Sequence, residues 1–495
     1  MKKLFILIAL LHFLIPAIGK ELPKFSPNPW KDDYTSVSKM DNWKSWGTYN
    51  VHDPSCKKLG DKYYMYSTDA IFHPSREEAR RKDVPTGFIP IRRSYNLVDW
   101  EMIGWVFDSI PSEAVEWVRS QNNGRGATNI WAPYIMETDD RKFRLYYCVS
   151  AFGKKTSYIG LAEAESPEGP WVNKGAVVKT DSSSKMNAID PSVITDKKGR
   201  QWMHYGSYFG GTYCVELDPS TGFPLTPGDR GHLVARRANW RKDNLEAPEI
   251  YYHEPNGEYY LFYSYEPLMT TYNVRVARSK NAEGPFYDFF GKEISDTTNN
   301  FPVLTAAYEF DGHPGWVGVG HCGVFDDQHD NVYMVHQGRY APDSGLMDLH
   351  LRQVFFTPDG WPVVSPERYV EMSPVKFSKE DLEGEWEIIR IREPRVERNL
   401  EAGQILWGEG ALLNGEGNTS RYVTLNKNDS SWNFDSGNQI LSLTIDGEEI
   451  KNLIIHPGHD WERETDTILF TGLDPEGRSV WGKLVDNYTF PVEHK

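Results

Sequence analysis

One short pattern recurs five times in this chain, and the repetition restricts the fold more than any other feature. Each copy is a turn residue followed by an alternating, aromatic-rich segment, as in Gly60-DKYYMYST and Gly257-EYYLFYSY. The copies are 80, 58, 58 and 73 residues apart when aligned on Met65, Leu145, Met203, Leu261 and Met334. Unit-length repetition of strand-forming segments is typical of a β-propeller or a β-solenoid.

A second pattern follows each copy, in which a strand ends in a polar turn containing Pro, Gly or Trp. Asn281-AEGPF and Thr357-PDGWP are examples, and they predict several antiparallel strands in each unit. Five units predict an all-β, five-bladed β-propeller over about residues 25–375. The first interval is the longest because it holds insertions at about 73–86 and 122–126, which we expect on the face that carries the site.

The pattern of strands and turns in the sequence changes after about Ser378. A chain of 495 residues exceeds the roughly 250–300 residues that one core organises, so a second domain is expected. Short strands with charged turns predict a small all-β barrel or sandwich over 380–495. Its predicted strands begin at Glu385, Gln404, Arg421, Gln439, Thr467 and Ser479. Glycan binding, shaping of a cleft and stabilisation of the propeller all stay open as its role.

The first 19 residues are typical of a secretory signal. Lys2 and Lys3 precede an apolar run over 4–15, and Ala17 and Gly19 supply small residues for cleavage. The run is too short to span a membrane, so we expect an exported protein, periplasmic or extracellular.

The composition limits the classes of molecule that the protein is expected to bind. The net charge of −16 disfavours nucleic acid and does not disfavour a neutral substrate. Aromatic residues make up 14%, which suits β-sheet cores and also sugar stacking. The cysteines Cys56, Cys148, Cys214 and Cys322 lie in four separate segments, so buried free thiols are slightly favoured over disulfides.

Acidic residues occupy matching places in three of the five units. Asp53, Asp190 and Glu246 lie 12 to 15 residues before the aligned strand position, where Trp131 and His321 stand in the other two units. In a propeller these positions surround the central channel, so three carboxylates should meet there. Gathering like charges is costly because each raises the pKa of its neighbours, which favours a functional reason.

Glycoside hydrolysis is the chemistry that this set of residues suits. It needs one protonated carboxylic acid at the leaving oxygen and one ionised carboxylate, with pKa values held apart by their environments. A third carboxylate beside the acid would hold the proton of that acid and orient it.

With these motifs the chain resembles glycoside hydrolase family 43, and within it the endo-acting α-1,5-L-arabinanases. The resemblance covers the propeller and rests on short motifs: His52-Asp53-Pro54-Ser55, Asn129-Ile130-Trp131-Ala132-Pro133, Asn187-Ala188-Ile189-Asp190-Pro191-Ser192, Leu245-Glu246-Ala247-Pro248 and Gly320-His321. It implies an inverting mechanism on arabinan, a plant cell-wall polysaccharide. Asp53 would be the general base and Glu246 the general acid, with Asp190 raising the pKa of Glu246 and positioning it.

The resemblance also assigns His321 to a structural Ca²⁺, coordinated largely by water, and implies no organic cofactor. Cys322 stands where a polar residue is expected, which weakens that assignment. Trp131 either stacks on a sugar or packs between blades. Asn187, Ser207 and Tyr208 either bind substrate beside the acids or are turn residues, and Arg352 could contact the substrate or Asp190.

Two other functions stay open. The early insertions could close one end of a cleft, which would make an exo-acting arabinofuranosidase or β-xylosidase. A non-catalytic carbohydrate-binding propeller predicts that one of the three acids is missing from the site, yet all three stand at matching offsets. Oligomeric state is not readable from the sequence.

Overall fold

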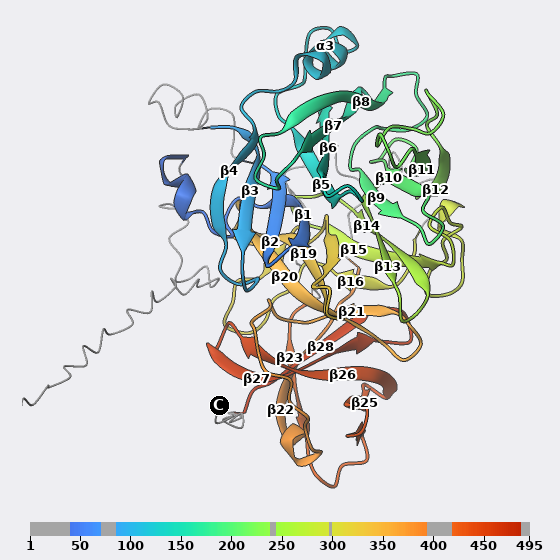
Figure 1. Ribbon diagram of the computed structural model, residues 1–495. Coiled ribbons are helices and arrows are strands. Elements are labelled where there is room, and N and C mark those ends of the chain that lie inside the picture. Colours follow the sequence, from blue (N-terminus) through green and yellow to red (C-terminus); the bar gives the residue numbers. More distant parts are fainter. Residues whose placement is uncertain (1–39, 71–85, 238–243, 297–298, 394–417, 487–495) are drawn as a thin grey trace, which may run out of the picture.

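The computed structural model describes residues 40–70, 86–237, 244–296, 299–393 and 418–486 (Figure 1). The predicted signal segment, nearly all of the 73–86 insertion and the predicted strand at Gln404 lie outside these residues. No helix in the described ranges has both the length and the apolar character needed to cross a membrane.

Five antiparallel sheets form the blades of the expected propeller, each from consecutive strands. The first has β1 (His52–Leu59), β2 (Lys62–Thr68), β3 (Phe88–Ser94) and β4 (Glu101–Phe107); the second has β5 (Trp131–Glu137), β6 (Phe143–Ser150), β7 (Ser157–Ala164) and β8 (Val172–Thr180); the third has β9 (Ser192–Thr195), β10 (Gln201–Tyr205), β11 (Thr212–Leu217) and β12 (His232–Ala235). The fourth has β13 (Leu245–His253), β14 (Glu258–Tyr265), β15 (Asn273–Ser279) and β16 (Val303–Thr305), and the fifth has β17 (Trp316–Val317), β18 (Gly323–Asp326), β19 (Val332–Tyr340), β20 (Asp343–Phe356) and β21 (Pro362–Val364). Short helices are η1 (Met40–Ser45), α3 (Ser112–Ser120), η2 (Ile294–Asp296) and η3 (Glu380–Leu382).

The repeat read from the sequence corresponds to one strand of each blade. Its five aligned residues lie on β2, β6, β10, β14 and β19, and all five are fully buried. The Pro- and Gly-containing turns lie between the third and fourth strands of the blades, as in Asn281-AEGPF after β15 and Thr357-PDGWP between β20 and β21. The predicted strand repeat is therefore confirmed.

The first strands of the blades face the centre of the ring. β1 contacts β5 and β18, and β9 and β13 continue the circle. Backbone pairing of Tyr49 with Asp348 closes the ring between the first blade and the fifth. The channel is thus lined by segments that lie far apart in the sequence.

The same backbone kink recurs where each of these inner strands begins. Asp53, Ala132, Asp190, Ala247 and His321 all have positive φ, between 41° and 57°. Such left-handed conformations are uncommon for residues other than glycine and concentrate at functional sites. Register shifts in β1, β5 and β13 next to these residues show that the kinks re-aim the neighbouring side chains.

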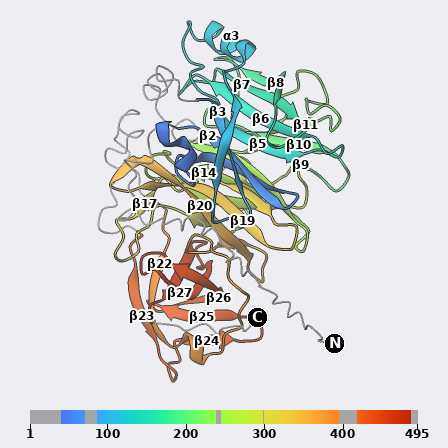
Figure 2. The ribbon, with the colours of Figure 1, turned by 60° about the vertical axis from the view of Figure 1, so that its left-hand side comes forward.

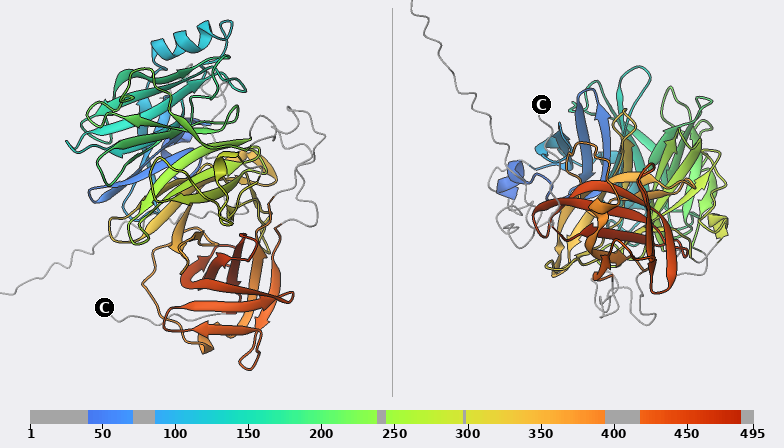
Figure 3. Two further views of the ribbon diagram at one scale, coloured as in Figure 1. Left: turned by 90° about the vertical axis from the view of Figure 1, so that its right-hand side faces the viewer. Right: turned by 90° about the horizontal axis from the view of Figure 1, so that it is seen from below.

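The C-terminal domain is one curled antiparallel sheet with the order β23-β22-β28-β27-β26-β25-β24 (Figure 3). Its strands are β22 (Gly384–Arg390), β23 (Arg421–Leu425), β24 (Trp432–Asp435), β25 (Ile440–Ile445), β26 (Glu448–Asp460), β27 (Thr465–Leu473) and β28 (Ser479–Leu484). β27 and β28 contact the outermost strands β21 and β16 of the last two blades. The helix α3 lies at the opposite end of the molecule (Figure 2).

All four cysteines are buried free thiols, as the sequence slightly favoured.

Candidate active site

Three carboxylates and one imidazole from four blades meet at the start of the inner strands. Asp53 is the second residue of β1 and Glu246 the second of β13, while Asp190 and His321 stand two residues before β9 and β18. The three acids are 6–9% exposed, and the charges of all three act on His321. The structure therefore brings together the residues that the repeat predicted.

Asp53 is held as an ionised carboxylate. Its Oδ1 lies 2.6 Å from Nδ1 of His52 and 2.8 Å from Nδ1 of His321, and its Oδ2 accepts a 2.7 Å hydrogen bond from Thr68. Burial would raise the pKa of Asp53, but His321 and His52 outweigh it and hold the pKa well below the ordinary value. This carboxylate can accept a proton at neutral pH.

The pKa values of Asp190 and Glu246 are shifted in the opposite direction. Burial raises the pKa of Asp190 to about 8, with the neighbouring charge of Glu246 adding to the rise and His321 opposing it. Burial also raises the pKa of Glu246. The backbone N–H of Ala247 donates to Oδ2 of Asp190 at 3.1 Å, which ties Asp190 to the residue after Glu246.

Two hydroxyl groups orient Glu246. Ser207, a predicted site residue, donates to Oε2 at 2.7 Å, and Tyr272 also hydrogen-bonds to this carboxylate. Asn187 acts one step further away, because its Nδ2 donates to the carbonyl of Ser207 and its Oδ1 accepts from Ser157. Tyr208 is half-buried, and its backbone N–H donates to the carbonyl of Leu245.

His321 is fixed by its ring and by its backbone. Its Nδ1 contacts Asp53, and its N–H donates to Ser264 at 2.9 Å. Burial would lower the pKa of His321, but Asp53 and the other two acids raise it to about 9. Within the described residues, only Glu367, Asp460 and Glu462 form a group of acids, His or Cys close enough to share a metal ion. A Ca²⁺ held by His321 would take the place of the proton on Nε2, which the raised pKa retains at neutral pH, and would be coordinated mainly by water.

Trp131 lines a pocket on the second blade. This pocket of about 600 Å³ is lined by Trp131, Phe152 and the 122–126 loop. The rings of Trp131 and Phe152 meet edge to face at 6.3 Å, and Phe152 is 63% exposed. The inserted 122–126 loop thus lies beside Trp131.

Arg352 does not reach the site. Its guanidinium is fully buried and donates to Tyr308, His336 and two backbone carbonyls at the boundary with the C-terminal domain. The idea that it contacts Asp190 or the substrate is wrong, because its strand, β20, is the third of the fifth blade. Cys322 likewise faces the hydrophobic core and not the channel.

Sequence reasoning missed several partners of the acids. Thr68 ends the repeated β2 strand, and its hydroxyl both donates to Asp53 and accepts from the N–H of Ala132 in the next blade. Glu249 is a fourth buried acid, which accepts from Ser192 on β9 and from the N–H of Val324 on β18. Its closeness to Glu246, three residues earlier in the sequence, could have indicated this acid, but the other blades have no equivalent residue in the repeat pattern.

The model of Glycosyl hydrolases family 43 matches residues 47–362, which is more than half of the chain. The chain belongs to this family. A C-terminal lipocalin-like domain of the same family matches residues 366–482. The first match ends at the start of β21, and the second begins two residues after β21 ends.

Known relatives of this family 43 glycoside hydrolase are arabinan-degrading enzymes. An extracellular endo-α-(1→5)-L-arabinanase of Thermotoga petrophila is 30% identical, covering 88% of this chain and 94% of its own. The crystal structure of the endo-1,5-α-L-arabinanase from this organism superposes with a TM-score of 0.72 at 27% identity, over 89% of this chain and 99% of that chain. An extracellular exo-α-(1→5)-L-arabinofuranosidase of Cellvibrio japonicus is 29% identical over 64% of this chain and 86% of its own.

Proposed function

We propose that this glycoside hydrolase cleaves α-1,5-linked L-arabinan within the chain, with inversion at the anomeric carbon. The observation that carries the proposal is the meeting of three buried carboxylates in one channel, with the pKa of Asp53 lowered and the pKa values of Asp190 and Glu246 raised. Direct displacement by water needs one acid of each kind. The names of the two relatives that match along nearly the whole chain support arabinan as the substrate.

Each acid has one step in this mechanism. Asp53 takes a proton from a water molecule, whose oxygen attacks the anomeric carbon. The bond from that carbon to the leaving oxygen breaks as Glu246 transfers its proton to this oxygen. Asp190 holds Glu246 in place through the N–H of Ala247, and above its own pKa of about 8 its negative charge also opposes loss of the proton from Glu246.

A Ca²⁺ bound by His321 Nε2 and water is part of the same proposal. A cation there would stabilise the ionised acids of the channel. We also propose export by the N-terminal signal, which the extracellular relatives support.

Exo attack is the second candidate. The inserted 122–126 loop borders the pocket beside Trp131, and a wall at this place would limit the length of chain that can pass. One relative, matched over 86% of its own length, is named as an exo-acting arabinofuranosidase.

Activity on debranched arabinan, with xylan as the comparison polymer, tests the proposal. Glu246→Gln should lower kcat by about 10²–10⁴-fold, as expected for loss of a general acid. Glu165→Gln, at a carboxylate that is 82% exposed, is the matched control and should keep full activity. Full activity of Glu246→Gln would contradict the assignment. Mixed oligosaccharides indicate endo attack and arabinose alone indicates exo attack, while the anomer released first reports inversion or retention.

A further inference from the structure

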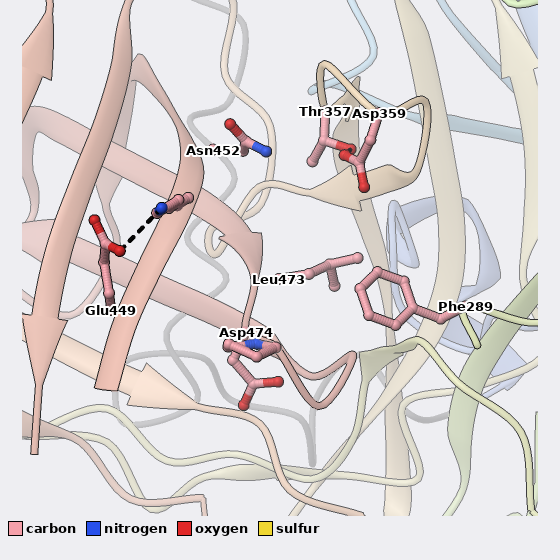
Figure 4. A pocket seen from close by; sticks show the side chains of 9 residues that line it. Phe289, Thr357, Asp359, Glu449, Asn452, Leu473 and Asp474 are labelled. Carbon is pink, nitrogen blue, oxygen red and sulfur yellow. Dashed lines mark hydrogen bonds and ion pairs between the residues drawn. The ribbon is translucent and has the colours of Figure 1, made fainter. Parts of the chain in front are cut away.

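A second pocket lies at the seam between the propeller and the C-terminal domain. It encloses about 350 Å³, within the range of about 300–1,000 Å³ common for small-molecule sites, which often lie between domains. Phe289 and Asp359 line it from the propeller, and Asn452 and Leu473 from the C-terminal sheet (Figure 4). Neither domain forms this pocket alone.

The pocket is far from the catalytic acids along the strands. β18 starts beside His321 and ends at Asp326, which pairs with Val332 on β19, and Val332 pairs with Val354 on β20. Asp359 follows the end of β20, so it lies at the opposite end of the blade from His321. A ligand here would not occupy the catalytic channel.

Aromatic surface is available at this seam. Phe289 is half-buried, with its ring 5.6 Å from that of Trp361, and Figure 4 shows it pointing toward Leu473. Tyr287 and Phe290, on the same segment, are 42% and 51% exposed. Aromatic rings set in such a surface offer an apolar body to a ligand that also carries polar groups.

Two polar groups at the pocket have unused hydrogen-bonding capacity. The side-chain amide of Asn452 makes no hydrogen bond within the described residues. One oxygen of Asp359 accepts from Thr357 at 2.6 Å, while the other has no partner among these residues. An amide and a carboxylate oxygen together can both donate to and accept from neighbouring hydroxyl groups.

The charges of the pocket favour a neutral ligand. Glu449 and Lys451 neutralise each other in an ion pair of 3.0 Å, and Asp474 is paired with Arg390. The acids of the pocket are not among the described residues that lie close enough together to share a metal ion. An apolar wall, an amide and a free carboxylate oxygen suit a polyhydroxylated, uncharged molecule.

We propose that this seam pocket is a second, non-catalytic glycan-binding site that holds a stretch of the neutral polysaccharide cut in the channel. The inference rests on the proposed function. A chain held at the seam raises the local concentration of the same polymer at the channel, which benefits long chains and not short ones. The C-terminal domain then contributes to substrate binding because it supplies one wall of the pocket.

The test is electrophoresis of folded, full-length protein through native gels that contain debranched arabinan. The inactive Glu246→Gln variant serves as the background, so that the polymer is not degraded. Adding Asn452→Asp keeps the shape and tolerates the φ of 59°, but replaces a donor with a charge. We expect retention by arabinan to weaken about tenfold, the change that 1.4 kcal/mol produces.

Asn433→Asp is the matched control, because it makes the same change at an exposed residue of β24 outside the pocket. Asp359→Asn is a second pocket variant, which leaves an acceptor for Thr357 and should also weaken retention. Equal retention of the pocket variants and the control would overturn the inference, as would a Glu246→Gln background that arabinan does not retard. Release of reducing sugar by the wild-type protein decides the proposed function separately.

Discussion

At the scale of residues, Asp53, Asp190 and Glu246 share one channel, yet their pKa values shift in opposite directions because their partners differ. Asp53 has two imidazoles and a hydroxyl around it, whereas burial dominates at Asp190 and Glu246. Blades that are equivalent in the repeat thus differ in the residues that contact each acid. Those neighbours shift the pKa values of chemically similar carboxylates apart, which suits Asp53 to act as a base and Glu246 to act as an acid.

The pH dependence of kcat/KM follows from the raised pKa of Glu246. The acid works only while protonated, so activity should fall as the pH rises through its pKa. The pKa of Asp190 is itself raised to about 8, so Asp190 carries a negative charge on the alkaline side of the profile. Asp190→Asn removes that charge, which opposes ionisation of Glu246, so the alkaline limb should move to lower pH and kcat should fall. A profile measured on debranched arabinan checks this. An unmoved limb would show that Asp190 does not set the pKa of Glu246.

Thr68 should position the base. Thr68→Val removes the hydrogen bond to Asp53 and leaves the N–H of Ala132 without an acceptor. Loss of one such buried bond costs about 1–3 kcal/mol, so kcat/KM should drop about tenfold. Thr68→Ser retains the hydroxyl and should restore most of the activity. Equal losses in both variants would indicate a packing role.

The sequence predicted the acids because they recur in register, and it missed their partners because those do not recur. Thr68 lies on β2, which pairs with the strand of Asp53, and Tyr272 lies between β14 and β15 in the same blade as Glu246, but the sequence does not show that these hydroxyl groups point at the acids. The sequence also left Arg352 as a candidate contact of the substrate or Asp190, because it does not show which way a side chain in a repeat unit points. Its guanidinium lies in the core instead.

At the scale of elements, strong alternation of apolar and polar residues predicted the blade strands, whereas strands with weaker patterns in the C-terminal domain were not predicted. β26 is 13 residues long but contains Pro457 and Gly458, which are disfavoured in strands. It forms nevertheless, because β25 and β27 pair with it on both sides. Tertiary pairing overrode local preference there.

The hairpin after β10 places Ser207 against Glu246, and Gly206 permits its path. Gly206 has φ of 137°, and a Cβ there would lie 2.3 Å from the carbonyl oxygen of Gly211. Gly206→Ala should therefore shift Ser207, lower the thermal midpoint and reduce kcat. Strain of this kind costs about 1–3 kcal/mol.

Gly199→Ala is the control for this variant. Gly199 also has positive φ, at 77°, but nothing lies within 4 Å of its Cβ position. The thermal midpoint should fall less than in Gly206→Ala, with kcat unchanged. Equal kcat in both variants would contradict a positioning role for this hairpin.

At the scale of the whole molecule, one hydrophobic cluster spans the seam between the two domains. The cluster that includes Val303 and Met334 of the blades also contains Ile389, Leu473 and Trp481 of the C-terminal sheet. Backbone pairing of Val303 with Arg478 continues across the seam. The predicted small all-β domain is confirmed as a curled seven-stranded sheet, and the propeller forms part of its packing surface.

A buried charge cluster lies at the same seam and should control its stability. The Nζ atom of Lys483 lies 2.8 Å from Glu367 of the propeller side, and 3.1 Å and 2.5 Å from Asp460 and Glu462 of the C-terminal domain. Lys483→Met would leave three buried acids without their shared cation. Breaking a buried ion pair in this way costs about 3–5 kcal/mol.

We therefore expect Lys483→Met to lower the thermal midpoint of the whole protein in one calorimetric transition, since one hydrophobic cluster spans the seam between the domains. Lys427→Met, in an exposed pair with Glu380 at 3.7 Å, should leave the midpoint unchanged. Two separated transitions in the Lys483 variant, with the propeller transition unmoved, would show that the domains are stabilised independently. A single shifted transition follows if the C-terminal sheet completes the folding unit on which the channel depends.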